Sequence, residues 1–329
     1  MIRWAQRKGK IGGFTNSTFL ALIPKENRCS SFSRFRPISL CNSSYKILSK
    51  IFTTRLKPLL PSVISENQGG FLPNRHIIDS ILLVQEAIHS SLSRKEKGFV
   101  LKLNMANAFN RVRHSFLIVV IKKMGFESPF INIIVACISR PWISPLINGR
   151  PGEAFQSSRG LRQGCLLSPY LFILMAESFN QAFDHNQRVG LITGIKFGNG
   201  AKNINHSQFA DDTLLIGGAS NIMARQFKKL LDQSMGYSGG LVNQLKSCIY
   251  EWNTSNQVIH SIANIFGVTC NLEWTHFSYL GMPMNLGPLK AETWNGIIDK
   301  VKRKVQQWGT QIFVFLHPLQ LLEVCRNSV

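Results

Sequence analysis

The spacing of hydrophobic and polar residues changes several times along the chain, and each change marks a predicted secondary-structure element. Residues 17–24, STFLALIP, form a short apolar run that ends at a proline, which predicts a strand. In LKLNM at 101–105, apolar and polar residues alternate, as is typical of a strand with one buried face. HSQFADDTLLIGG at 206–218 predicts two strands joined by a two-residue turn of Asp211 and Asp212.

Other segments carry apolar residues at the spacing of a helix, often after a residue suited to cap it. Ser43 or Ser44 is predicted to cap a helix that stops before Pro58, and Ser168, followed by Pro169, is predicted to cap a long one. Further helices are predicted from Asp79, as cap, to about Leu92, at 114–139, at 221–236, and from Ala291 as a basic amphipathic segment. Side chains expected to face inward include Ile47, Ile51 and Leu82. The sequence also predicts a turn at 35–40, a loop at 69–75, a hairpin across 142–160 and a short strand at 279–284.

The overall charge of the chain adds a first indication of its partner. Among 329 residues, 38 Lys and Arg face 17 Asp and Glu, which gives a formal net charge of +21, spread along the whole sequence. A field of this sign and size indicates a polyanionic partner, and nucleic acid is the usual one. Binding to anionic lipid, or to a ribosome-like assembly, is the alternative that composition leaves open.

Several classes of protein are disfavoured by what the sequence lacks. No uncharged run of about 18 apolar residues occurs, so we expect no membrane span. The basic N-terminus has no hydrophobic region of the kind found in secretion signals. The seven cysteines are scattered without a CxxC pair, which argues against a zinc site and a disulfide framework and favours a reducing, intracellular compartment.

Adjacent carboxylates at a predicted hairpin tip are the first candidate chemistry. Asp211 and Asp212 repel each other unless a cation binds, and Mg²⁺ prefers carboxylate oxygens; a simple solvated turn is the alternative. Two-metal phosphoryl transfer would need at least one more carboxylate from another strand end. The obvious position is the end of the strand LKLNM, where Asn104 offers an amide instead. The glycine- and arginine-containing segment SRGLRQG at 158–164 is a candidate resting place for a nucleotide, although such turns are common.

The order of these segments resembles a known family. FRPISLCNSSYKILSKIFTTRLKPLLPSVISENQGGFLPNRHIIDSILLVQEAIH is followed by LKLNMANAFNRV, RGLRQGCLLSPYLFILMAE, FADDTLL, GLVNQLKS and YLGMPM. Together they closely resemble the reverse transcriptase of plant LINE-type non-LTR retrotransposons, over about residues 15–305.

This resemblance implies an α+β fold of the right-hand polymerase type, with fingers, a palm whose antiparallel sheet packs on helices, and a partial thumb. The resemblance assigns the first part of the fingers to 1–97, the palm strand motif to 98–111, and a connection between fingers and palm to 112–155. It assigns the palm, with the FADD hairpin and a primer-grip-like turn, to 156–286, and the start of a thumb, expected to be truncated, to 287–329. The implied activity is that of an RNA-directed DNA polymerase. Its implied partners are an RNA template, a DNA primer and dNTPs, with two Mg²⁺ ions and a nuclear or cytoplasmic location.

The resemblance also assigns roles to residues. It implies that Asp211 and Asp212 are metal ligands, together with the backbone carbonyl of Met105, and that Lys246 lies near the departing pyrophosphate. Phe109 corresponds to the aromatic gate that selects dNTP over rNTP, and this argues against an RNA-copying RNA polymerase. The remaining correspondences are Arg36, Arg75, Gln163 and Gly164 for the nucleotide or template, and Tyr279, Leu280 and Gly281 for the primer grip.

The sequence departs from the family pattern close to the chemistry. The pattern has Asp at the position of Asn104, a basic residue at Asn107, Asp at Asn110, and Asp-Pro where this chain has Cys165 and Leu166. An amide offers a cation one neutral oxygen and also points N–H donors at it. We therefore expect a weakened two-metal site and slow or absent polymerisation. A catalytically silent, nucleic-acid-binding remnant of a mobile element is the alternative to a working enzyme.

Overall fold

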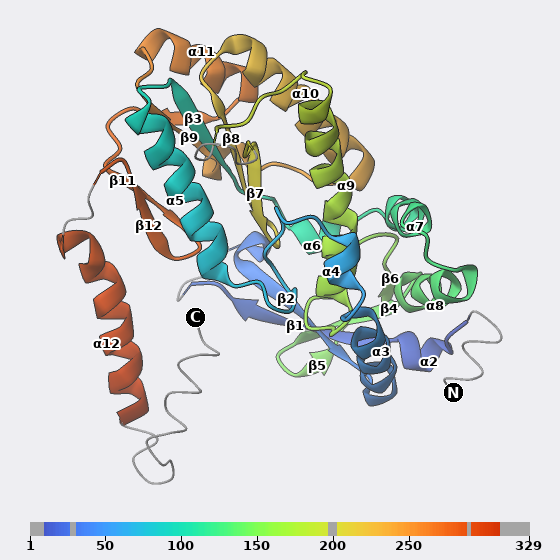
Figure 1. Cartoon of the computed structure of the whole chain (residues 1–329). Helices are drawn as coiled ribbons and strands as arrows, with labels where there is room; N and C mark the ends of the chain where they lie inside the picture. Colours follow the sequence, from blue (N-terminus) through green and yellow to red (C-terminus); the bar gives the residue numbers. More distant parts are fainter. Residues whose placement is uncertain (1–9, 27–30, 197–202, 288–290, 310–329) are drawn as a thin grey trace. The chain divides into compact units, whose positions relative to one another are not determined.

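A computed structural model describes residues 10–26, 31–196, 203–287 and 291–309, and Figure 1 draws the elements they form. The chain divides into two compact units, Met1–Trp274 and Thr275–Val329. Within the described residues, the first unit holds two five-stranded sheets and the second a two-stranded hairpin. None of the described helices is both long enough and apolar enough to cross a bilayer.

The elements of each unit follow in chain order. The helices of the first unit are α2 (Gly13–Asn16), α3 (Ser43–Leu56), α4 (Leu60–Val63), α5 (Ile77–Ser93), α6 (Ala108–Arg111), α7 (His114–Lys123), α8 (Ser128–Ile138), α9 (Ser168–Arg188), α10 (Asn221–Ser238) and α11 (Asn256–Phe266). Its strands are β1 (Thr18–Pro24), β2 (Phe35–Cys41), β3 (Gly98–Leu103), β4 (Trp142–Ile147), β5 (Arg150–Pro151), β6 (Phe155–Gln156), β7 (His206–Phe209), β8 (Asp212–Gly218), β9 (Cys248–Trp252) and β10 (Thr269–Asn271). The second unit contains β11 (His276–Tyr279), β12 (Met282–Asn285) and α12 (Asn295–Gly309), and the thumb residues predicted beyond 309 lie outside the described part.

The sheet that carries the candidate chemistry has the strand order β10-β9-β3-β8-β7. The central strand β3 pairs antiparallel with both β8 and β9. One face of this sheet packs on α9, α10 and α11 through a shared apolar cluster that includes Phe99, Leu101, Phe183, Phe227 and Ile262. The period-two pattern of β3 therefore buries Phe99, Leu101 and Leu103 against the helices and leaves Lys102 and Asn104 on the opposite face.

Helix α5 covers one end of that opposite face. Trp252 on β9 donates a hydrogen bond from Nε1 to the Ser91 hydroxyl of α5, at 2.9 Å, and both side chains are buried. Gly98 pairs with Trp252, so this covered end is where β3 begins. The other end, where β3 finishes beside Lys102 and Asn104, is less buried.

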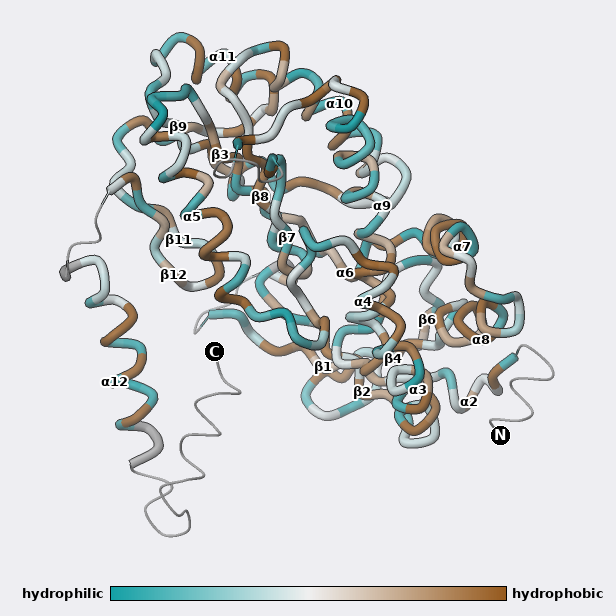
Figure 2. Tube along the Cα trace, in the orientation of Figure 1, coloured by the Kyte–Doolittle hydropathy of each residue, from teal (hydrophilic) through white to brown (hydrophobic). Residues whose placement is uncertain are grey.

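The second sheet joins β2, β1, β4, β5 and β6. β1 runs antiparallel to β2 and parallel to β4. Nearby, α3, α7, α8 and the first half of α9 share a separate apolar core, and Figure 2 shows α7 and α8 as largely hydrophobic helices.

Several local predictions were wrong for identifiable reasons. The predicted turn at 35–40 is strand β2, whose Pro37 is tolerated because β2 lies at the edge of its sheet. The predicted helix at 114–139 is two helices, separated around Gly125, which adopts a φ of +85°. Ile47 and Leu82 are exposed rather than inward-facing.

Helix starts were also displaced by a residue or more. Asn42, not Ser43 or Ser44, caps α3 by accepting a hydrogen bond from the Ser44 backbone N–H. Asp79 lies in the first turn of α5 and accepts from the backbone N–H of His76, the capping residue. Ser168 is the first residue of α9 rather than its cap.

The contact between Gly98 and Trp252 gives a stability prediction. A Cβ at position 98 would lie 2.2 Å from Trp252 Cζ2, and the indole is held by its bond to Ser91. We expect Gly98→Ala to lower the free energy of unfolding by about 1–3 kcal/mol, as overpacking does in other cores. Urea unfolding measures the change.

Gly236→Ala is the matched control. Gly236 lies inside α10, and a Cβ there would meet nothing within 4 Å. This substitution should raise stability by about 0.5–1 kcal/mol because glycine is a poor residue for a helix interior. Equal effects of the two substitutions would contradict the assigned contact.

Candidate active site

The acidic hairpin differs from its prediction by one residue. Phe209 pairs with Asp212, so the two turn residues are Ala210 and Asp211, and Asp212 is already the first residue of β8. Ala210 adopts the left-handed conformation, with a φ of +58°. The predicted turn of Asp211 and Asp212 is therefore corrected, and the two carboxylates stand at the turn and at the strand start.

The register of the central strands brings Asn104 to this hairpin. Leu103 pairs with Thr213, and continuing that antiparallel register by one residue sets Asn104 opposite Asp212. Side chains opposite each other lie on the same face of a sheet. The amide at position 104 is thus where a third carboxylate would join Asp211 and Asp212.

The segment before β9 docks on the same strand end. The Asn104 backbone N–H donates to the Ser247 hydroxyl at 3.0 Å, and its carbonyl accepts from the Asn243 N–H at 2.8 Å. Met105 forms an isolated antiparallel bridge with Val242. Lys246, which is exposed, is thereby brought to the same end of the sheet through its backbone.

Electrostatics at the hairpin favour binding of a cation. Both aspartates are exposed to solvent, yet desolvation by the protein packed around them raises the pKa of Asp211. Desolvation, and then the charge of Asp211, raise the pKa of Asp212, while Lys102 acts in the opposite direction. Two close carboxylates that are costly to keep charged are stabilised when a divalent cation binds them.

The donor set fits one hard cation better than two. Among the described residues there is no cluster of three or more His, Cys, Asp or Glu side chains able to hold a metal. Asp211 and Asp212 provide carboxylate oxygens of the kind Mg²⁺ prefers, whereas Asn104 provides a neutral oxygen.

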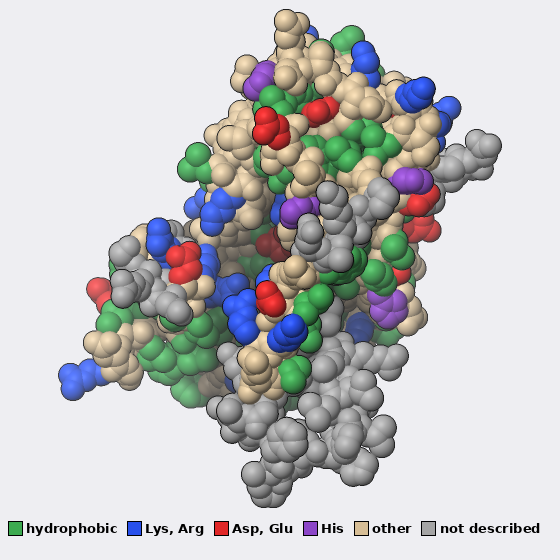
Figure 3. Space-filling model, turned by 90° about the vertical axis from the view of Figure 1, so that its left-hand side faces the viewer, with side chains coloured by type: hydrophobic (Ala, Val, Ile, Leu, Met, Phe, Trp, Pro, Cys, Tyr) green, Lys and Arg blue, Asp and Glu red, His purple; other side chains and the backbone are tan. Residues whose placement is uncertain are grey.

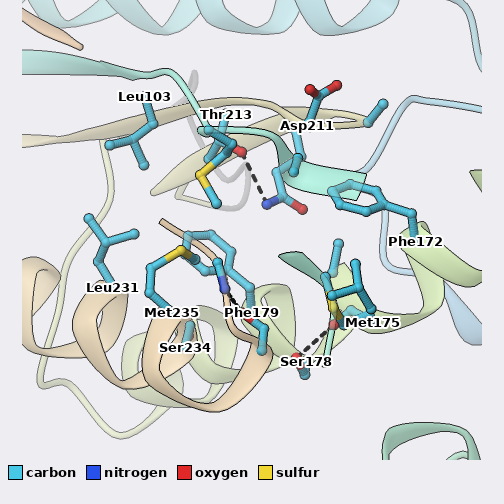
Figure 4. Close-up of a pocket in the computed structure, with 18 residues that line it drawn as sticks. Leu103, Phe172, Met175, Ser178, Phe179, Asp211, Thr213, Leu231, Ser234 and Met235 are labelled. Carbon is cyan, nitrogen blue, oxygen red and sulfur yellow. Dashed lines mark hydrogen bonds between the residues drawn. The ribbon is translucent and has the colours of Figure 1, made fainter. Parts of the chain in front are cut away.

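An apolar cavity of about 50 Å³ lies on the core side of the hairpin. Its lining includes Leu103, Phe179, Leu231 and Met235, and Figure 4 shows the Asp211 carboxylate pointing away from these side chains. The hairpin therefore rests on apolar packing and directs its acidic group outward.

A second group of predicted residues surrounds Phe109. Its ring stacks on Phe172 of α9, with centroids 4.7 Å apart. The Phe109 carbonyl accepts from the Leu161 N–H at 2.8 Å, and the Gln163 carbonyl accepts from the Ser39 N–H of β2 at 2.8 Å. Gly164, with a φ of +88°, packs against Ile38. The segment SRGLRQG thus connects the predicted sugar gate to the edge of the second sheet.

A recess of about 200 Å³ lies along this connection. Its polar lining includes Ser39, Asn110, Arg159 and Gln163. Of these, only Gln163 was predicted as a nucleotide contact. Arg159 belongs to the segment SRGLRQG that the sequence offered as a resting place for a nucleotide, and Asn110 was noted only as a departure from the family pattern.

The other predicted residues are more dispersed. Arg36 is exposed on β2. Arg75 donates from its guanidinium to the carbonyls of Ile64, Ser65 and Gln68, at 3.0, 2.5 and 2.6 Å, so its described contacts are with the backbone. Their roles toward a nucleotide stay predictions.

The predicted primer grip lies in the second unit. Residues 279–284 are not one strand, because Leu280 and Gly281 form the turn between β11 and β12. Both turn residues have positive φ, 51° and 84°. Tyr279 is the last residue of β11, directly before this turn. The role of Tyr279, Leu280 and Gly281 as a primer grip stays a prediction.

Comparison with known proteins identifies the class. The sequence profile of the family described as "Reverse transcriptase (RNA-dependent DNA polymerase)" matches residues 23–284. The chain belongs to this family, and the expected reverse transcriptase resemblance is confirmed. The right-hand polymerase fold is also supported by a solved apo telomerase from Candida tropicalis, truncated from its C-terminal domain. It aligns with a TM-score of 0.57 at 11% identity over 88% of this chain and 58% of that truncated chain.

The relatives narrow the class further. The chain is 28% identical over 212 residues to the transposon TX1 uncharacterized 149 kDa protein of Xenopus laevis, covering 64% of this chain and 16% of the relative. It is 26% identical over 215 residues to the Pol polyprotein of the type-2 retrotransposable element R2DM of Drosophila melanogaster, covering 65% and 19%. It is therefore similar to the polymerase region of non-LTR elements and spans less than a fifth of either relative.

Two residues that sequence reasoning missed bear on the acidic hairpin. Lys102 lies on the same face of β3 as Asn104, and its positive charge lowers the pKa of Asp212 against the opposing effect of burial. The alternation of apolar and polar residues in LKLNM already indicated that Lys102 and Asn104 share a face of the strand. Gln68 hydrogen-bonds the hairpin turn from a segment 142 residues away, and nothing in the local sequence indicates that contact.

The motif SRGLRQG also contains a buried cation with incomplete bonding. Arg162 is 8% exposed, donates from Nη2 to Asn16, and lies 4.3 Å above the Tyr45 ring centroid. Its Nε and Nη1 are buried with no hydrogen-bond partner. Cys165 lines the same small cavity as Arg162 and offers only a thiol.

We expect Cys165→Asp to be more stable than Cys165→Ser, because a carboxylate in this cavity can pair with the buried charge of Arg162 and a hydroxyl cannot. Thermal unfolding compares this variant with Cys165→Ser, which provides no charge. If the aspartate variant is no more stable than the serine variant, Arg162 does not require an anion here.

His114 gives a prediction for pH. Its Nε2 lies 2.7 Å from the carbonyl of Gly160, the glycine that packs on Asn110. Burial lowers the pKa of His114 below 6.5; the bond to Gly160 opposes this shift and the charge of Arg162 adds to it.

The folded protein therefore binds this proton less readily than the unfolded chain. Its contribution to stability is full above pH 6.5 and is lost as the pH falls through the folded pKa. One such group changes stability by at most about 1.4 kcal/mol per pH unit. Urea unfolding from pH 7.5 to 5 should show a shallower pH dependence for His114→Gln; identical slopes would contradict the assignment.

Proposed function

We propose that this chain is the polymerase region of a LINE-like non-LTR retrotransposon, acting on an RNA template, a DNA primer and dNTPs inside the cell. In this proposal residues 1–97 and 112–155 serve the fingers and their connection, 98–111 and 156–286 the palm, and 287–329 the start of a thumb. The family membership supports the reaction. The net charge of +21 supports a nucleic-acid partner, and Figure 3 displays Lys and Arg side chains spread over one face of the protein.

The proposed chemistry centres on the end of β3. Asp211 and Asp212 hold Mg²⁺, which when bound supplies positive charge near the reacting phosphate oxygens. Phe109, fixed by its stacking on Phe172, borders the sugar of the incoming nucleotide. Gln163 lines the recess that also includes Asn110, and Gly164 follows it in the chain.

The observation that carries the proposal is the position of Asn104 opposite Asp212. In the proposed site an aspartate at this position would be the third carboxylate ligand, and the residue present is an amide. We propose that the activity of this copy is strongly reduced for that reason. A nucleic-acid-binding remnant without polymerase activity is the second candidate, and the same amide favours it.

Asn104→Asp is the direct test. We expect it to raise the rate of primer extension on an RNA template with dNTPs and Mg²⁺ by at least about 10²-fold, since losing one preorganised electrostatic partner commonly costs 10²–10³. The measurement is single-turnover extension with the unmodified chain and the variant side by side.

Asn107→Asp is the matched control, because it makes the same change of charge three residues away on an exposed turn residue. It should not restore extension. Extension by the unmodified chain at the rate of the Asn104→Asp variant would contradict the proposed impairment. Salt-sensitive binding to a template–primer duplex, with no extension by either chain, would instead favour the remnant.

A further inference from the structure

The turn of the acidic hairpin holds an unfavourable backbone conformation. Ala210 has a φ of +58°, a left-handed conformation in which the Cβ of a non-glycine residue crowds the following carbonyl oxygen. The next two residues are Asp211 and Asp212, so the direction of both carboxylates follows from how this turn is held. A turn of this kind persists only when the surrounding structure fixes it.

The side chain of Gln68 provides that support. Gln68 is fully buried, and its Oε1 accepts hydrogen bonds from the backbone N–H groups of Ala210 and Gly70, both at 2.8 Å. Its Nε2 donates to the Ala210 carbonyl at 3.3 Å and to Gln208 Oε1 at 3.4 Å. One amide therefore binds both the N–H and the carbonyl of the left-handed residue.

The backbone around Gln68 is fixed to the same hairpin. The Gly69 N–H donates to the Gln208 carbonyl at 2.8 Å, and the Gln208 N–H donates to the Asn67 carbonyl at 2.7 Å. Arg75 donates to the Gln68 carbonyl at 2.6 Å and so holds the segment from its other side. The turn and residues 67–70 thus form one hydrogen-bonded unit.

Gly70 completes the fit. A Cβ at this position would lie 2.5 Å from the backbone nitrogen of Ala210. The close approach leaves no room for a side chain between the two segments. Residues 67–70 therefore press directly on the turn.

We propose that Gln68 is a positioning residue for the acidic hairpin, holding Ala210 in its left-handed conformation so that Asp211 and Asp212 are aimed to bind a divalent cation together. The inference rests on the proposed polymerase function. It adds a requirement beyond the aspartates themselves: an uncharged side chain at position 68 that both accepts and donates. The Gln68 amide accepts from the Ala210 N–H through its oxygen and donates to the Ala210 carbonyl through its nitrogen.

The first test uses the Asn104→Asp background. Gln68→Met keeps the length of the side chain and removes its hydrogen bonds. We expect the Mg²⁺ concentration for half-maximal extension to rise about 10–100-fold, as for other residues that orient metal ligands, with the dNTP KM at saturating Mg²⁺ unchanged. Adding Ala210→Gly should recover part of the loss, because glycine adopts positive φ without support.

Two further variants separate positioning from general stability. Gly70→Ala should weaken the response to Mg²⁺ while leaving Gln68 in place, because its Cβ would displace Ala210. Gln187→Met removes a glutamine that joins α9 to Asn203 and Asn205 through its amide, and should leave the Mg²⁺ requirement unchanged. The inference is overturned if Gln187→Met and Gln68→Met shift the Mg²⁺ requirement equally, or if Ala210→Gly gives no recovery.

A second readout does not require polymerisation. With hydrogen peroxide and ascorbate added, Fe²⁺ bound in place of Mg²⁺ reduces peroxide to hydroxide and a hydroxyl radical, and ascorbate returns the Fe³⁺ to Fe²⁺. The radicals cut the chain near the metal ligands, so the Fe²⁺ concentration for cleavage near Asp211 reports cation affinity. Gln68→Met should raise that concentration, and Gln68→Met with Ala210→Gly should lower it again. If no variant extends a primer but this pattern is found, the proposed function fails and the positioning role stands. Equal cleavage with and without Gln68 overturns the positioning role.

Discussion

The pairing of β3 with β8 on one side and β9 on the other is the constraint on which the site depends. This register sets Asn104 opposite Asp212 and draws the segment 243–247 onto the same strand end through two backbone hydrogen bonds. The apolar face of β3 fixes the register, because a slip of one residue would turn Phe99, Leu101 and Leu103 away from the helices and bury Lys102. The same packing that stabilises the fold therefore brings the chemistry together.

Opposing charges meet at this strand end. Asp211 and Asp212 are partly desolvated, and Lys102 is the cation that offsets Asp212. An aspartate at 104 would add a third negative charge beside this pair, whereas the amide adds none. In the proposed polymerase this difference lowers the affinity of the site for cations.

Sequence patterns located most of the elements of the palm but not their limits. The strand at 101–105, the acidic hairpin and the helices that begin at 168 and 221 all exist, because each buries an apolar stripe of the predicted period. Strand β2 was missed and a turn predicted at 35–40 because Pro37 is unusual within a strand. One helix was predicted at 114–139, across Gly125, because the apolar spacing continues on both sides of that glycine. At the hairpin the error was one residue: the turn is Ala210 and Asp211 rather than Asp211 and Asp212, and Asp212 begins β8.

The sequence by itself determined the family, and it showed the acidic pair and the amide at Asn104, since these depend on residue types in a fixed order. Only the tertiary structure decided how the pair is held. Gln68 reaches Ala210 across 142 residues of chain, Arg75 bonds the backbone beside Gln68, and Arg162 lies buried near Cys165 without a full set of partners. Such contacts depend on which segments the packed sheets bring side by side, and the local spacing of residue types carries no record of that proximity.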